Sequence, residues 1–145
     1  MRNRVRSCIF VLLLFIGNSA SYSQDKQPYY MQGEVSISSD TGDFKYAGVN
    51  ITFCNNTKKD IKKIVLILFL SDFDDSSTFS GNNRIVSEYS KSIDSLSTVG
   101  YCISLDDYIT AVPDTPFQID CLYAARIEYE DGSVWEDPYG IYAVQ

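Results

Sequence analysis

The stretch that decides the fold reads Val49-Asn50-Ile51-Thr52-Phe53-Cys54, then the polar segment 55–60, then Ile61 to Asp72. Its first part alternates apolar and polar residues, as in a β-strand with one buried face. Segment 55–60, Asn-Asn-Thr-Lys-Lys-Asp, has the composition of a turn. From Lys63 to Ser71 the chain is apolar on both faces, which indicates a central strand, and the β-branched residues favour a strand over a buried helix. The stretch therefore predicts two strands joined as a hairpin.

The rest of the chain carries the same kind of signal. Period-two alternation and flanking turn residues predict strands at 31–38, 47–54, 63–71, 84–89, 97–105, 117–130 and 134–142. Within 117–130, strict alternation places Cys121 and Tyr123 on one face with Ile127, and Asp131-Gly132 predicts a two-residue hairpin turn. About seven strands without helical segments indicate an all-β fold, an antiparallel immunoglobulin-like or fibronectin type III-like sandwich.

The stretch Val49 to Asp72 also resembles the FxLYD family of bacterial exported or envelope-associated sandwich domains. A strand, an Asn-containing turn, an Ile61-Lys62-Lys63-Ile64 entry and a strand ending Leu68-Phe69-Leu70-Ser71-Asp72 follow one another in the family's order. Leu68 stands where the family has Phe, and Ser71 where it has Tyr. The resemblance covers roughly half of the chain that follows the N-terminal leader. The resemblance implies an accessory or interaction module without known catalysis.

The N-terminal segment has the layout of a secretory signal peptide. Three arginines within the first six residues precede nine apolar residues from Cys8 to Ile16, and small residues follow. We expect cleavage near Ser23, with Ala20 as the alternative. Nine apolar residues are fewer than the roughly 20 that a membrane-spanning helix needs, so no stable membrane anchor is expected after cleavage. The chain then divides into a signal peptide, 1–23, and a single β-sandwich domain, 24–145, that is exported to the periplasm, the cell envelope or the medium.

Charge and composition disfavour several classes of function. The formal net charge is −7, and it becomes −10 for residues 24–145 because three arginines and no acid leave with the leader. Such a surface repels phosphates, so no nucleic acid partner is expected. The chain contains no histidine, which removes Ser/His/Asp and Cys/His nucleophiles and His-containing zinc sites. A carboxylate pair or a Lys-activated serine is the remaining catalytic option, but most acids fall in expected turns. We expect no enzyme and no cofactor.

Three cysteines remain after export, an odd number for an oxidising compartment. In a sandwich of this strand order the second and fifth strands are neighbours, and side-chain parity puts Cys54 and Cys102 on the same side of that pair. A Cys54–Cys102 disulfide is the first expectation. A Cys102–Cys121 disulfide and three reduced thiols are the alternatives.

Aromatic residues near the C-terminus are the candidate binding residues. Segment 135–142, Trp-Glu-Asp-Pro-Tyr-Gly-Ile-Tyr, brings Trp135, Tyr139 and Tyr142 beside acids. Exposed Tyr and Trp give large, rigid contact areas, which suit a protein or a sugar. The alternative is that these three residues cap the core of the sandwich. Tyr29-Tyr30, near the first strand, is a second aromatic site.

One acidic segment offers ligands for a cation. Asp72, Asp74 and Asp75 follow the apolar strand within a few residues of one another and present oxygen atoms of the kind that Ca²⁺ binds. The segment lacks the Gly and the distal Glu of an EF-hand loop. These three residues are the candidate metal ligands.

These observations predict an exported, non-catalytic interaction or accessory module of the periplasm or cell envelope, whose partner is a protein. The alternative is a secreted carbohydrate-binding domain, or a carbohydrate-cleaving domain that uses a carboxylate pair. The two differ in one structural requirement: the alternative needs Trp135 and its neighbouring tyrosines to form an exposed flat face, with two carboxyl groups across a groove.

Overall fold

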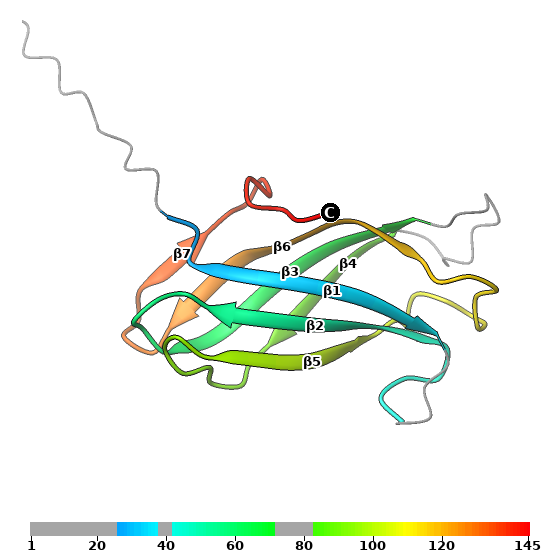
Figure 1. The fold of residues 1–145 in the computed structure, drawn as a ribbon, viewed down its shortest axis with the longest axis horizontal. Helices are drawn as coiled ribbons and strands as arrows, with labels where there is room; N and C mark the ends of the chain where they lie inside the picture. The colour runs from blue at the N-terminus through cyan, green and yellow to red at the C-terminus, as the bar shows by residue number, and fades with distance from the viewer. Residues whose placement is uncertain (1–25, 38–41, 72–82) are drawn as a thin grey trace, which may run out of the picture.

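The computed structural model describes residues 26–37, 42–71 and 83–145, which form seven antiparallel strands in two sheets (Figure 1). One sheet has the order β1-β2-β5 and the other the order β4-β3-β6-β7. The first sheet contains β1 (Tyr29–Ile37), β2 (Ala47–Asn55) and β5 (Thr98–Ser104); the second contains β3 (Ile61–Ser71), β4 (Arg84–Tyr89), β6 (Gln118–Tyr129) and β7 (Val134–Glu136). The predicted all-β architecture of about seven strands in two sheets is confirmed.

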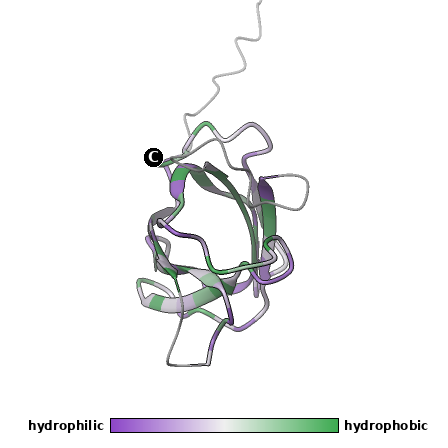
Figure 2. Ribbon diagram, turned by 90° about the vertical axis from the view of Figure 1, so that its right-hand side faces the viewer, coloured by the Kyte–Doolittle hydropathy of each residue, from purple (hydrophilic) through white to green (hydrophobic). Residues whose placement is uncertain are grey.

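The core lies between the two sheets and follows the alternation in the sequence. On β2 the inward side chains are Val49, Ile51 and Phe53, as predicted, and all three are buried. On β3 every second residue from Ile64 to Leu70 is buried. Figure 2 shows hydrophobic stretches on strands of both layers. Both sheets therefore bury one apolar face against the other.

The predicted hairpin over the deciding stretch is wrong. β2 pairs with β1 and β5, whereas β3 pairs with β4 and β6, so the two strands belong to different sheets. The buried side chain of Asn55 organises the connection: its amide Nδ2 donates to the Lys59 carbonyl at 2.8 Å and to the Asp94 carbonyl at 3.1 Å. The Asn55 Oδ1 accepts two hydrogen bonds from Thr57, one from its backbone N–H at 3.0 Å and one from its side-chain hydroxyl at 2.7 Å. Segment 55–60 turns the chain, as predicted, but carries it across the sandwich.

The prediction of a single apolar face on β6 is also wrong. The register with β3 shifts between Val65 and Leu66 and again between Phe69 and Leu70, as at β-bulges. Each extra residue reverses the side-chain parity, so Leu122 and Ala124 are fully buried in the core. Cys121 pairs with Phe69 and Tyr123 with Ile67, on the parity opposite to the buried Leu66 and Leu68.

The final strand is shorter than predicted. β7 ends at Glu136, whereas the sequence pattern continued to Tyr142. The turn before it has three residues instead of two, because the Tyr129 N–H bonds to the Ser133 carbonyl at 3.0 Å and Gly132 takes a positive φ of 83°. A three-residue loop with a left-handed glycine is a common hairpin closure.

Candidate functional site

Two of the three predicted binding residues pack against the protein itself. The half-buried Trp135 ring meets the buried Tyr29 ring edge-on, with centroids 5.7 Å apart. The Tyr142 ring also contacts Trp135, with the two ring centroids 5.9 Å apart. Tyr29 in turn stacks on Phe53 at 5.3 Å. This arrangement agrees with the capping alternative for Trp135 and Tyr142.

The third predicted residue, Tyr139, lies in the loop formed by residues 137–142, which a buried carboxylate holds in place. Asp137 is 2% exposed, and its two carboxylate oxygens accept the N–H groups of Ile141 at 2.9 Å and Tyr142 at 3.0 Å. The Asp137 N–H donates to the Ala125 carbonyl of β6 at 3.0 Å. A buried carboxylate with hydrogen-bonded oxygens fixes the geometry of its neighbours. The 137–142 loop is thus attached to β6.

Gly140 is the residue that lets this loop lie close to β6. Its φ is 67°, in the left-handed region that glycine tolerates best. A Cβ at this position would stand 3.1 Å from the Tyr123 ring, and the ring atoms leave little room for it. The backbone passes over Tyr123, and the side chains on either side of Gly140 are directed outward.

Tyr139 and Ile141 are the two most exposed large apolar residues in the described part of the chain, at 86% and 75%. They stand two positions apart on a loop whose backbone is fixed. Two exposed apolar side chains on a hydrogen-bonded loop suit a contact site for another macromolecule, because their burial is favourable and the loop backbone needs little ordering. Tyr139 is one of the predicted binding residues, whereas Ile141 is not, because its exposure depends on the turn at Gly140.

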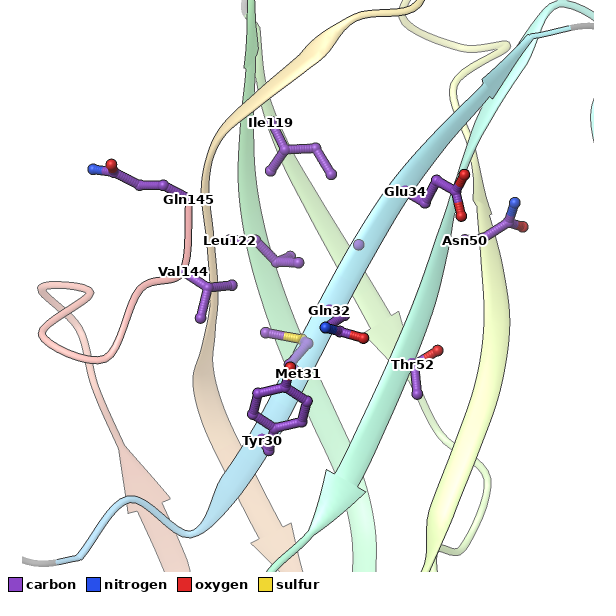
Figure 3. A pocket seen from close by; sticks show the side chains of 11 residues that line it. Tyr30, Met31, Gln32, Glu34, Asn50, Thr52, Ile119, Leu122, Val144 and Gln145 are labelled. Carbon is purple, nitrogen blue, oxygen red and sulfur yellow. The ribbon is translucent and has the colours of Figure 1, made fainter.

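A second feature is a groove of about 610 Å³ beside β1, which we call the β1 groove (Figure 3). It is lined by residues of β1, β2, β6 and the C-terminal segment: Tyr30, Met31, Gln32, Gly33, Glu34, Asn50, Thr52, Ile119, Leu122, Val144 and Gln145. In Figure 3 the apolar Ile119, Leu122 and Val144 lie on the β6 side, and the polar Glu34 and Thr52 lie toward β2. Val144 exchanges two backbone hydrogen bonds with Leu122, at 2.9 and 3.0 Å.

Of the residues that line this groove, only Tyr30 belongs to an aromatic site predicted from the sequence. Glu34, in β1, is exposed. The groove itself arises where four segments distant in sequence meet, and no local pattern signals it.

The predicted cation site lies outside the described residues, since Asp72, Asp74 and Asp75 all fall in the segment 72–82. Within the ranges that the structure describes, no three His, Cys, Asp or Glu residues form a group able to hold a metal ion. Among the described residues that line the β1 groove, Glu34 is the only one with a carboxylate side chain.

The structure does not bring the predicted disulfide partners together. β2 and β5 are neighbours, as expected, but Cys54 pairs with Thr98 and Cys102 with Asn50. The two cysteines are therefore offset by four residues, about 13 Å along the strands, whereas bridged Cα atoms lie within roughly 7 Å. Cys54, Cys102 and Cys121 are free thiols here. Burial raises the pKa of the Cys102 and Cys121 thiols, with nearby carboxylates adding to the shift.

The described ranges include no helix with the length and apolar character needed to cross a bilayer. The predicted signal peptide and its cleavage site fall within residues 1–25, outside the described part. Comparison of the chain with protein-family models, curated proteins and solved structures gives no match.

Proposed function

We propose that this chain is an exported, non-catalytic interaction module that binds a protein partner through Tyr139 and Ile141 of the 137–142 loop. The observation that carries the proposal is the outward display of these two side chains, the most exposed large apolar residues described, on a loop fixed by Asp137. The module works in the periplasm or cell envelope after removal of its leader. We propose an immunoglobulin-like or fibronectin type III-like sandwich for its fold. The seven strands in a three-stranded and a four-stranded sheet support this class, as does the FxLYD resemblance of residues 49–72.

Energetics favour a protein partner that offers an apolar pocket. Complete burial of a large apolar side chain contributes about 1.5–3 kcal/mol, so Tyr139 and Ile141 together contribute about 3–6 kcal/mol to such a contact. Because the loop is already ordered by the Asp137 hydrogen bonds, binding costs little conformational entropy. The Tyr139 ring adds a hydroxyl that can bond at the rim of such a pocket.

The carbohydrate alternative has weaker support. A sugar platform needs an exposed flat aromatic face, but Trp135 is half-buried and Tyr29 meets it edge-on. Carboxylate-based cleavage needs two acids across a groove, and in the described part of the chain Glu34 is the only carboxylate side chain that lines the β1 groove. The interaction module is therefore the function that the geometry favours.

Photo-crosslinking tests the proposal. A photoreactive phenylalanine at position 139, in the full chain expressed in its own cells, should give a specific cross-linked protein. The same amino acid at position 96 is the matched control, because Leu96 is also a large exposed residue, at 65%, but lies in another turn. The double variant Y139S/I141S should weaken binding of the purified cross-linked partner at least tenfold, and Leu96→Ser should not. Equal cross-linking at both positions, or unchanged affinity in Y139S/I141S, would refute the proposal.

A further inference from the structure

β1 is the longest of the four edge strands in the described sheets. It has nine residues, whereas the other edge strands β5, β4 and β7 have seven, six and three. All nine residues pair with β2 in one continuous register, without a bulge. Its other edge pairs with no described strand. β1 therefore presents a regular ladder on its free side.

The alternation of hydrogen bonds between β1 and β2 shows which backbone groups of β1 face its free edge. Pro28 O accepts the Asn56 N–H at 2.9 Å, and Asn55 N–H bonds to Ser97 O at 2.9 Å on the opposite edge of β2. In an antiparallel pair, bonded and non-bonded residues alternate. Residues 30, 32, 34 and 36 thus bond to β2, and the N–H and C=O groups of Met31, Gly33 and Val35 point away from it.

β1 lacks most of the devices that normally protect such an edge. Natural edge strands are blocked by lysines, prolines, bulges or short length. The sequence of β1, Tyr-Tyr-Met-Gln-Gly-Glu-Val-Ser-Ile, has no Lys and no Pro, and its single charge is Glu34. By contrast, the shorter edge strand β4 carries both Arg84 and Glu88.

The β1 groove runs beside this open ladder and supplies the second surface that a bound strand needs. Ile119, Leu122 and Val144 face it from the β6 side (Figure 3). The side chains of a strand added at the free edge would point alternately to its two faces. One set would contact these apolar residues, and the other set would lie beside Glu34. A Cβ at Gly33 would meet Ile119 and Leu122 at 2.9 Å, so glycine lets β1 lie close above this apolar floor.

We propose that an extended segment of another protein adds to the free edge of β1 as a further strand, with apolar residues in the β1 groove and a Lys or Arg beside Glu34. Charge selects this occupant. Glu34 is the single charged side chain that lines the groove in the described residues, and the whole chain carries a net charge of −7. A basic segment is attracted to this edge, whereas a second copy of the chain is repelled. This contact is separate from the one proposed for Tyr139 and Ile141.

Two synthetic nine-residue peptides of alternating valine and threonine test the proposal, one with lysine and one with glutamate at the central threonine position. The lysine peptide should bind the full domain at least tenfold more tightly in a fluorescence titration. Hydrogen exchange of the Met31, Gly33 and Val35 amides should slow at least tenfold in its presence. The amides of Gln32 and Glu34, already bonded to β2, serve as internal controls and should not change.

Variants separate backbone pairing from nonspecific attraction. Methylation of the peptide nitrogens that face β1 should abolish binding, whereas methylation of the alternate nitrogens should not; this comparison leaves the protein unaltered. Glu34→Lys should reverse the preference between the two peptides, and Glu130→Lys, an equal charge change at an exposed position outside the groove, should leave it unchanged. Y139S/I141S should bind the lysine peptide normally, which keeps this test independent of the proposed loop contact.

Several results would overturn the inference. Absence of binding at millimolar peptide, equal loss with both methylation patterns, or unchanged preference in Glu34→Lys would exclude strand addition to β1. Concentration-dependent dimerisation in sedimentation, abolished by Val35→Pro, would assign the edge to a second copy instead. The Val35 N–H faces the free edge, so proline there removes no bond to β2.

Discussion

Replacement of Asn55 by alanine examines the connection that carries the chain from one sheet to the other. The Asn55 side chain is fully buried and makes four hydrogen bonds, two as donor and two as acceptor. Its donor bonds reach the carbonyls of Lys59 and Asp94, and so join the turn after β2 to the segment that precedes β5. Alanine removes all four bonds and leaves the partner groups in a site shaped for an amide.

The magnitude follows from the hydrogen bonds. A typical intramolecular hydrogen bond contributes about 1 kcal/mol net, and each buried group left without a partner costs roughly 1–3 kcal/mol. Thr57 and Lys59 lie near the surface and regain bonds to water, which reduces the total. We expect Asn55→Ala to lower the free energy of unfolding by about 3 kcal/mol, a large share of the stability of a small domain.

Urea unfolding followed by tryptophan fluorescence measures this change. Asn56→Ala is the matched control, because Asn56 is the neighbouring residue of the same type but is exposed, and it should change stability by less than about 0.5 kcal/mol. Asn55→Asp keeps the acceptor but turns an oxygen toward two carbonyls, and should destabilise at least as much as alanine at neutral pH. Equal effects of Asn55→Ala and Asn56→Ala would refute the role assigned to Asn55.

Three further predictions concern the core, an ion pair and the thiols. Leu66→Asp should prevent folding, since it places an unpaired carboxylate in the core, whereas Lys62→Asp on the exposed part of the same strand should fold; circular dichroism distinguishes them. The Lys59 ammonium lies 2.9 Å from the Asp131 carboxylate and, with the hydrogen bonds from Ser133, lowers the pKa of that carboxyl group. The ionised Asp131 therefore stabilises the fold above the ordinary aspartate pKa of about 3.9, and this contribution is lost as the pH falls toward the lowered pKa. NMR titration of Lys59→Met should show that pKa rising toward its ordinary value, and no change would contradict the assigned cause. Alkylation of the denatured but unreduced domain 24–145 should modify all three cysteines, whereas a peptide containing linked Cys54 and Cys102 would contradict the observed register.

Part of the candidate site was readable from the sequence. Segment 135–142 stands out because aromatic residues and acids are concentrated there, and Tyr139, one of its predicted binding residues, is highly exposed. The sequence did not separate Tyr139 from Trp135, because their difference in exposure depends on contacts made by Tyr29, which lies more than 100 residues earlier. The role of Asp137 was hidden in the same way, since an acid in a polar segment gives no sign of being buried.

The sequence by itself determined the strands, because alternation of apolar and polar residues is a local property: the backbone repeats every two residues, and each strand carries its own pattern. β4 matched its predicted range, and β2 and β3 began or ended within two residues of theirs. The partners of each strand, the bulges of β6 and the open edge of β1 were decided only by the tertiary structure. Pairing depends on which apolar faces bury one another and which distant groups satisfy the backbone. A turn such as 55–60 therefore looks the same in sequence whether it closes a hairpin or crosses between sheets.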